Sequence, residues 1–242
     1  MKIKPLLSTI MNIISDNVLP LSCLLCRQHC PHPLALCEAC VALITSADSA
    51  QSSDTSTLLS SSSFSNTSLS SNNDNQPWDK IRYLSAYQTP LKELIQKGKF
   101  DNNLAVFKVL GQLLALQIQQ QGYDPDLVII PVPLYADRLI ERGYNQANEI
   151  ALPLASQLSL SINNDTVVRV KKAQTQHFLS KQQRLLNAAH LFECMAFVPK
   201  KVAIIDDVYT TGATMRSICT CLKNAGTQMI EVWIIARTLK AS

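Results

Sequence analysis

The chain has 242 residues, 47% of them hydrophobic and 17% charged, with a formal net charge of +4 at neutral pH. This length leaves room for one α/β domain with a buried core and a small accessory module. A charge this mild does not by itself indicate a nucleic-acid binder, and no apolar stretch is long enough for a membrane span.

The first 21 residues could be mistaken for an export signal, because Lys2 and Lys4 precede an apolar stretch. Polar residues from Asn12 to Asn17 interrupt that stretch, and Pro20 stands where an aliphatic residue would be wanted. The apolar side chains fall instead at helical spacing: Leu6, Leu7, Ile10, Ile13 and Ile14. We therefore expect an amphipathic helix, no export and a cytoplasmic protein.

Five of the eight cysteines lie between residues 23 and 40, which favours a metal site in a reducing compartment over a disulfide framework. Two Cys-x-x-Cys pairs can surround one tetrahedral Zn²⁺: Cys23, Cys26, Cys37 and Cys40. A four-cysteine site is closed, so its zinc would be structural. Competing ligands lie between the pairs: His29, Cys30 and His32. A reduced cluster without metal is the alternative.

Residues 45–76 are dominated by Ser, Thr, Asn and Asp. Such a segment buries too little apolar surface to offset its ordering entropy, which predicts a disordered linker or insertion. We therefore divide the chain into an N-terminal helix and zinc module (1–44), a linker (45–77) and a larger α/β domain (78–242).

Ordered sequence resumes near Trp78 with three predicted elements: a strand at 83–87, a helix at 90–97 and a helix at 104–121. Lys97 and Lys99 flank Gly98 at the end of the first helix. They are either ligand contacts or two solvated lysines, and the sequence does not separate the two.

A second buried strand is predicted at 127–131, and the loop after it lies where open α/β sheets bind ligands. The loop carries Arg138 and Arg142, whose guanidinium groups would suit a pyrophosphate. Two surface arginines on a helix are the alternative. A helix is predicted from there to Leu158, and Pro153 would kink it.

A strand near 166–170 leads into a basic polar run to residue 190, which predicts a loop and then a helix, or a plain solvated loop. Buried strands near 201–206 and 229–236 complete a parallel sheet with helices between its strands. The other thiols are expected to be small core residues: Cys194, Cys219 and Cys221.

The most informative stretch is 202–214, which begins as a strand buried on both faces. Asp206 and Asp207 end that run, and alternation sends their side chains to opposite faces. Small and hydroxyl residues follow before a periodic helix: Thr210, Thr211, Gly212, Ala213 and Thr214. This arrangement predicts an anion cradle, and the acids beside it suit a ribose 5-phosphate. The alternative is an ordinary turn with solvated acids and a threonine cap.

Four apolar residues followed by Asp-Asp-x-x-Thr-Thr-Gly-x-Thr resemble the motif with which type I phosphoribosyltransferases bind phosphoribosyl pyrophosphate (PRPP). By that resemblance, Asp206 and Asp207 would hold the ribose hydroxyls, and Thr210 to Thr214 would wrap the 5-phosphate. Pro-Val-Pro-Leu at 131–134, Arg138 and Arg-Gly-Tyr-Asn-Gln at 142–146 are similar to the ComF family of phosphoribosyltransferase-like proteins. That family also has an N-terminal four-cysteine zinc module. A further segment fits it: Arg169, Gln176, Leu179, Arg184 and Asn187.

The resemblance implies a parallel α/β sheet of the type I phosphoribosyltransferase kind, preceded by the zinc module; the insertion at 45–76 departs from the family pattern. It implies PRPP as ligand, with Mg²⁺ bridging its pyrophosphate and ribose hydroxyls. Arg138 and Arg142 would stabilise the leaving pyrophosphate, and the region 166–190 would be a mobile flap that shields the reaction from water. No residue stands out as a base, so the acceptor is unknown.

The ComF resemblance also implies a role in natural competence and the use of incoming DNA. A non-catalytic scaffold with the PRPP fold is the alternative, acting through competence-machinery proteins or single-stranded DNA. Direct DNA binding is the weaker expectation, because the chain lacks a dense basic stripe with interleaved aromatic residues.

Overall fold

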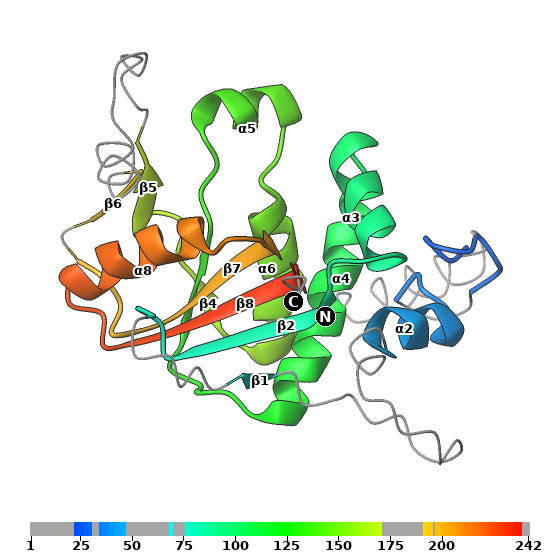
Figure 1. The fold of residues 1–242 in the computed structure, drawn as a ribbon, viewed down its shortest axis with the longest axis horizontal. Coiled ribbons are helices and arrows are strands. Elements are labelled where there is room, and N and C mark those ends of the chain that lie inside the picture. The colour runs from blue at the N-terminus through cyan, green and yellow to red at the C-terminus, as the bar shows by residue number, and fades with distance from the viewer. Residues whose placement is uncertain are drawn as a thin grey trace, which may run out of the picture.

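The computed structural model describes residues 22–30, 34–46, 68–69, 76–170, 191–195 and 197–238. They form a six-stranded sheet, a separate two-stranded ribbon and the surrounding helices (Figure 1). The strand order of the sheet is β1-β2-β8-β7-β3-β4, and every neighbouring pair is parallel except β1 and β2. The predicted parallel α/β sheet is confirmed.

The strands of this sheet are β1 Ser68–Leu69, β2 Lys80–Ala86, β3 Val128–Pro131, β4 Ser161–Ile162, β7 Lys201–Tyr209 and β8 Met229–Arg237. β7 is a central strand that is apolar on both faces, since Ile204 and Ile205 are both fully buried. Ile204 is aligned with Val232 of β8 on one side and with Ile130 of β3 on the other. The central position of β7 places its carboxyl end in the middle of the sheet edge.

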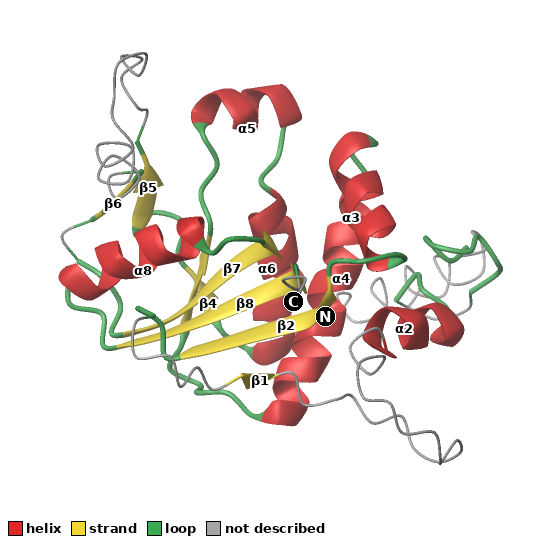
Figure 2. Cartoon of the chain, viewed as in Figure 1, coloured by secondary structure: helices red, strands yellow, loops and turns green. Residues whose placement is uncertain are grey.

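Helices cover both faces of the sheet (Figure 2). They are α2 Glu38–Thr45, α3 Leu91–Phe100, α4 Leu104–Gln121, α5 Ala136–Arg142, α6 Gln146–Leu158 and α8 Ala213–Asn224. Helices α3, α4 and α6 share a core with Ile205 and Trp233, whereas α8 shares one with Ile204 and Val232. In Figure 2, α8 accordingly lies in front of the sheet, and α4 and α6 lie behind it.

Pro153 lies inside α6 and contacts α4 at a glycine. A Cβ on Gly111 would come within 2.4 Å of the Ile150 carbonyl oxygen and 2.9 Å of Pro153 Cγ. Glycine therefore allows the two helices to approach closely. Helix α6 runs from Gln146 to Leu158 as predicted, with the proline inside it.

Two expectations for the second half of the chain are wrong. Strand β5 (Val167–Arg169) pairs with β6 (Phe192–Cys194) in an antiparallel ribbon and does not join the parallel sheet. Val167 and Phe192 are buried while Val168 is exposed, as in a ribbon that packs on one face only.

Cys194 of β6 and Cys221 of α8 form a disulfide, and so are not core thiols. Cys219 is fully buried, as predicted. The two cysteines of α8 differ because residues two apart on a helix point in different directions, so Cys219 faces the core and Cys221 faces the ribbon.

Several predictions concern residues outside the described ranges: the helix expected near 6–14, most of the linker at 45–77, and the basic run at 171–190. Within the described part of the chain, no helix is both long enough and apolar enough to cross a membrane.

Candidate functional site

Asp206 and Asp207 lie near the carboxyl end of β7, which extends past them to Tyr209. The residues before them alternate between the two faces of the sheet, with Ile204 in the core on the α8 side and Ile205 in the core on the α4 and α6 side. Asp207 continues the second series and contacts Lys99 of α3. The two carboxylates therefore approach the site from opposite faces, as the alternation predicts.

The segment 206–214, called here the acid–threonine loop, combines exposed hydroxyls with a constrained glycine. Thr210 and Thr211 are exposed, and α8 begins directly afterwards at Ala213. Gly212 has φ +74°, and a Cβ there would lie 2.3 Å from Tyr209 Oη. Glycine is needed for both reasons. The first N–H groups of α8 and the threonine hydroxyls together make an open anion-binding loop.

Hydrogen bonds hold the shape of this loop. The Thr238 N–H and hydroxyl both donate to the Tyr209 carbonyl oxygen, at 2.9 and 3.2 Å. The guanidinium of Arg216 donates to the Thr211 carbonyl oxygen from the first turns of α8. These bonds use backbone carbonyl oxygens of the loop. The Thr211 hydroxyl oxygen accepts from the Ala213 N–H at 3.4 Å, so its O–H remains able to donate to a ligand.

The carboxyl group of Asp206 is poised to change charge near neutral pH. Burial and, to a smaller extent, the negative charge of Asp207 raise its pKa, which is about 7. The Asp207 N–H, which donates to Asp206 Oδ1 at 2.9 Å, and the cations Lys99 and Arg169 oppose that shift. The pair of acids therefore carries less than two full negative charges at neutral pH.

Lys99 forms an ion pair with Asp207, with Lys99 Nζ 2.5 Å from Asp207 Oδ2. Their side chains are only 24% and 12% exposed. The last turn of α3 thus delivers a cation to an acid that lies far along the chain. Of the two alternatives for Lys99, the structure excludes a fully solvated lysine.

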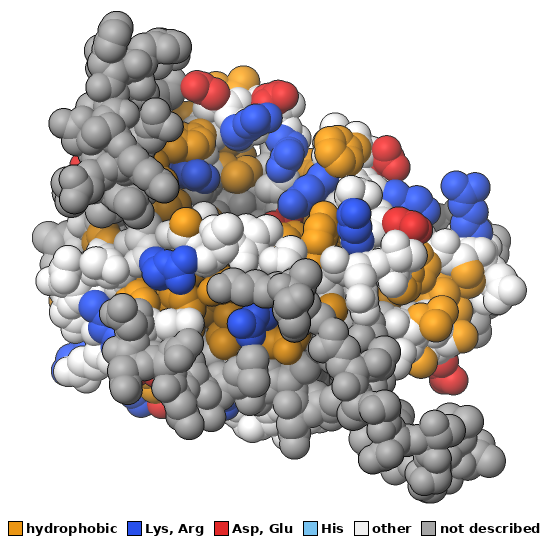
Figure 3. Space-filling view, viewed as in Figure 1, with side chains coloured by type: hydrophobic (Ala, Val, Ile, Leu, Met, Phe, Trp, Pro, Cys, Tyr) orange, Lys and Arg blue, Asp and Glu red, His pale blue; other side chains and the backbone are white. Residues whose placement is uncertain are grey.

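The loop after β3 contains helix α5, which carries both Arg138 and Arg142, as in the alternative of surface arginines on a helix. Helix α5 has no buried residues, and Leu139 and Ile140 are exposed. Arg138 pairs with Glu141 of the same helix at 3.0 Å, with both side chains more than half exposed. Figure 3 shows Lys and Arg side chains gathered around α5 and α3, above the edge of the sheet. Arg138 and Arg142 thus lie on a basic surface, but neither has a described contact with the acids.

The end of this loop is anchored beside α3. Tyr144 donates its hydroxyl to the Gly98 carbonyl oxygen at 2.7 Å, and Asn145 donates its side-chain N–H to the Val132 carbonyl oxygen at 3.0 Å. Asn145 also caps α6, since its side-chain oxygen accepts from the Ala147 N–H. Burial raises the pKa of Tyr144, and both Arg142 and Asp207 act on it electrostatically. Tyr144 therefore ties the end of the arginine-bearing loop to α3, next to the lysine that pairs with Asp207.

Arg169, at the end of β5, is stacked between aromatic rings. Its guanidinium lies 3.9 Å from the ring centroid of Tyr135 and 5.2 Å from that of Phe192. This contact joins the ribbon to the start of α5. Because Arg169 is also close enough to lower the pKa of Asp206, it belongs to the electrostatic surroundings of the site.

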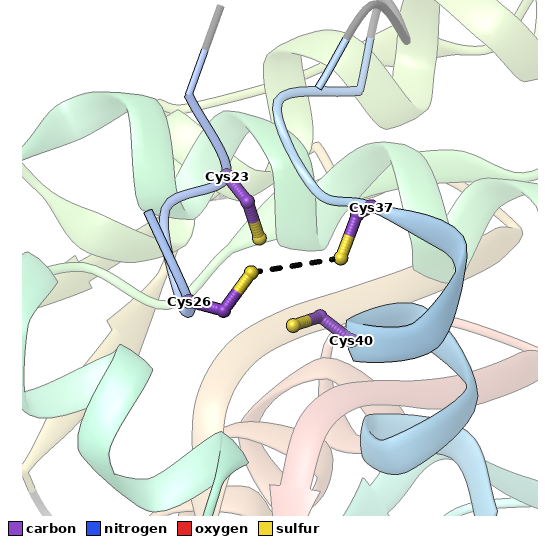
Figure 4. A group of neighbouring side chains, drawn as sticks. All are labelled: Cys23, Cys26, Cys37 and Cys40. Carbon is purple, nitrogen blue, oxygen red and sulfur yellow. Dashed lines mark hydrogen bonds between the residues drawn. The ribbon is translucent and has the colours of Figure 1, made fainter. Parts of the chain in front are cut away.

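The four predicted cysteine ligands come together in one cluster (Figure 4). The Sγ atoms of Cys23, Cys26, Cys37 and Cys40 all lie within 4.8 Å of one another and point inward. Cys30 is buried in the core outside the cluster, and His29 is exposed; His32 lies outside the described residues. The donor set fits a closed tetrahedral Zn²⁺ site with four thiolates.

Two of the thiols show how the backbone prepares this cluster. Burial by itself raises the pKa of Cys23, but the backbone N–H groups of Cys26, Cys37 and Leu25 lower it to about 6. Burial and the neighbouring thiols raise the pKa of Cys40. A cluster in which one thiol ionises easily and its neighbours resist further negative charge calls for a bound cation.

The structure therefore places Asp206, Asp207 and the threonines side by side and adds two residues to them: Tyr144, and Lys99, which the sequence left as either a ligand contact or a solvated lysine. One indication of the role of Lys99 was present in the sequence, because two lysines flank a glycine at the end of its helix. Tyr144 carried one only through its place beside Arg142 and Asn145. Arg138 and Arg142 lie near the site but outside contact with the acids.

No family model matches the chain. Curated relatives do: it is 38% identical to competence protein F of Haemophilus influenzae over 168 residues, 66% of this chain and 73% of the relative. It is 32% identical to DNA utilization protein YhgH of Escherichia coli, covering 67% of this chain and 74% of the relative. It is 25% identical to competence protein ComFC of Streptococcus pneumoniae, covering 64% and 67%.

Among solved structures, a glutamine PRPP amidotransferase from B. subtilis matches 53% of this chain and 25% of its own chain. The identity is 21% and the TM-score 0.39, a likeness too low to carry an argument. Competence protein F and YhgH establish the family of the chain, since each is about a third identical to it over nearly three quarters of its own length. The chain belongs to the ComF family, the family of competence protein F.

Proposed function

We propose that the chain binds PRPP in the acid–threonine loop and transfers its phosphoribosyl group to an acceptor. One observation carries this proposal: two carboxylates reach the loop from opposite faces of the sheet, directly before exposed threonines and a helix N-terminus. Asp206 and Asp207 would accept hydrogen bonds from the ribose hydroxyls, and residues Thr210 to Thr214 would donate to the 5-phosphate.

Bond cleavage at C1 of the ribose leaves positive charge on the sugar and negative charge on pyrophosphate. The carboxylates would offset the first, and the basic surface around α5 would offset the second. The Arg138–Glu141 pair is exposed and worth at most about 1 kcal/mol, so Arg138 can exchange it for a pyrophosphate oxygen. Mg²⁺, which prefers phosphate oxygens and water, would be held mainly by the ligand.

The experiment is a calorimetric titration of PRPP with Mg²⁺ into the wild type and into the double variant Asp206→Ala/Asp207→Ala. We expect saturable binding to the wild type and its loss in the double variant. Asp165→Ala is a matched control, since it removes an exposed carboxylate of a turn and should bind PRPP as the wild type does. A folded, zinc-loaded wild type that does not bind PRPP would exclude the transferase.

A second candidate is a non-catalytic PRPP-fold protein that acts through competence-machinery proteins or single-stranded DNA. The basic surface around α5 and α3, with Phe100 and Ile140 exposed beside it, favours it. Strongly salt-dependent binding to single strands that persists in Asp206→Ala/Asp207→Ala would support this candidate.

With either activity, the relatives' names favour a role in natural competence or in the use of external DNA. We place that role in the cytoplasm, with a structural zinc in the four-cysteine cluster. The acceptor of the phosphoribosyl group would be found by screening bases and amines against the PRPP-loaded protein.

A further inference from the structure

The ion pair between Lys99 and Asp207 is unusual because it occupies an acid that the proposed ligand needs. Lys99 Nζ lies 2.5 Å from Asp207 Oδ2, and both side chains are largely buried. A ribose hydroxyl that donates to Asp207 must displace this ammonium or share the carboxylate with it. A ribose hydroxyl on Asp207 therefore weakens the attraction between this carboxylate and the Lys99 ammonium.

The ion pair is not needed to hold α3 in place. A Cβ on Gly98 would lie 2.8 Å from Phe107 Cζ, so the end of α3 packs directly on α4. The Gly98 carbonyl oxygen also accepts the Tyr144 hydroxyl at 2.7 Å, and the Tyr144 ring packs on Phe107. With the backbone fixed at Gly98, directly before Lys99, the long side chain of Lys99 can move without displacing α3.

The groups around Lys99 indicate where its ammonium would go once it leaves Asp207. Lys99 contacts Asp207, and the loop that carries Arg142 reaches the residue before Lys99, because Tyr144, two residues after Arg142, donates its hydroxyl to the Gly98 carbonyl oxygen at 2.7 Å. PRPP would bring its hydroxyls to the acids and its pyrophosphate toward the arginine-bearing loop. An ammonium released from Asp207 would then be within the same small region as the pyrophosphate.

We propose that Lys99 is an exchangeable cation: it neutralises Asp207 in the empty site and moves to a pyrophosphate oxygen when PRPP binds. The inference rests on the proposed function, and it gives the site a preference for PRPP over ribose 5-phosphate. Ribose 5-phosphate also has to displace Lys99 from Asp207, but it offers the ammonium no pyrophosphate in return.

The test is calorimetry of PRPP and of ribose 5-phosphate, each with Mg²⁺, on the wild type and Lys99→Met. We expect Lys99→Met to bind PRPP about tenfold to a hundredfold more weakly, the loss of one charge-assisted hydrogen bond to phosphate. Ribose 5-phosphate should bind equally well or more tightly, because its competitor for Asp207 is gone. If Lys99 only held Asp207 in position, Lys99→Met would bind ribose 5-phosphate more weakly than the wild type.

Two variants complete the design. Lys99→Arg keeps the positive charge and should retain most of the preference for PRPP. Lys92→Met removes an exposed lysine from the same helix and should change neither affinity. Equal weakening of both ligands in Lys99→Met, or no change in either, overturns this inference alone. A wild type that binds neither ligand overturns the proposed function and this inference with it.

Discussion

The four-cysteine cluster and the acid–threonine loop differ in how their parts are brought together. The cluster takes all its donors from the turn at 23–26 and from the start of α2. The loop obtains its cation from Lys99 of α3 and its neighbour Tyr144 from the far side of β3, so its surroundings depend on the strand order of the sheet. Local spacing is therefore enough to specify the first site but not the second.

The two sites also differ in what is left open. In the cluster, the thiols face one another and leave no position for a substrate. In the loop, the acids are mostly covered while Thr210 and Thr211 are exposed. A closed site of like donors suits a structural ion, whereas an open site of mixed groups suits a ligand that comes and goes.

Among the predicted changes, loss of the zinc from the four-cysteine cluster should have the largest effect on stability. Cys40→Ser should abolish binding of one zinc per chain, and with it about 10 kcal/mol of binding free energy that helps to fold the module. Metal content after gel filtration and the thermal midpoint measure the two effects. The matched control is Cys30→Ser, because Cys30 is buried nearby but lies outside the cluster. Zinc lost from Cys30→Ser, or kept by Cys40→Ser, would show that the ligand set is wrong.

Substituting Gly212 should have the next largest effect. We expect Gly212→Ala to lower the free energy of unfolding by about 2 to 4 kcal/mol, since it combines a left-handed backbone with a clash against Tyr209. Urea unfolding measures the change.

Gly143→Ala separates the two causes of that loss. Gly143 has nearly the same φ, +77°, but a Cβ there meets nothing within 4 Å. It should cost only about 1 kcal/mol, the backbone contribution alone. Equal losses in the two variants would mean that Tyr209 does not restrict the loop.

The smallest effect concerns the charge of Asp206. The unfolded chain releases this proton near pH 4, while the folded protein keeps it until about pH 7, so wild-type stability should fall as the pH rises between those values. Asp206→Asn lacks that titration and should be more stable than the wild type above pH 7, by on the order of 1 to 2 kcal/mol without ligand.

Urea unfolding at pH 5 and pH 8 provides the measurement. Asp165→Asn, at an exposed acid of a turn, should follow the wild type at both values. If the advantage of Asp206→Asn were larger at pH 5 than at pH 8, the pKa of Asp206 would be lowered rather than raised.

Much of the fold follows from local pattern. The apolar runs at 127–131, 201–206 and 229–236 predicted three neighbouring strands, and helical periodicity predicted α4 with the bounds observed. The order of acids, glycine and threonines placed the acid–threonine loop, because these residues are adjacent in the chain.

What the sequence did not predict depends on contacts between distant segments. Helix α5 buries no residue, so it leaves no apolar periodicity to recognise. The strand at 167–169 resembles a sheet strand until its antiparallel partner at 192–194 is known. Lys99 is one of two similar lysines around a glycine, and only the packing of α3 beside β7 shows which of them meets Asp207.

The link between Cys194 and Cys221 gives the chain two kinds of sulfur with opposite chemical needs. The four clustered thiols hold a metal only while reduced, whereas the link exists only while oxidised. Reducing agents used in purification to protect the cluster would open the link, and air oxidation would endanger the cluster. In living cells the glutathione pool determines whether the Cys194–Cys221 link is oxidised or reduced. The extent to which Cys194 and Cys221 are alkylated before lysis would therefore report the redox state of the compartment where the protein works.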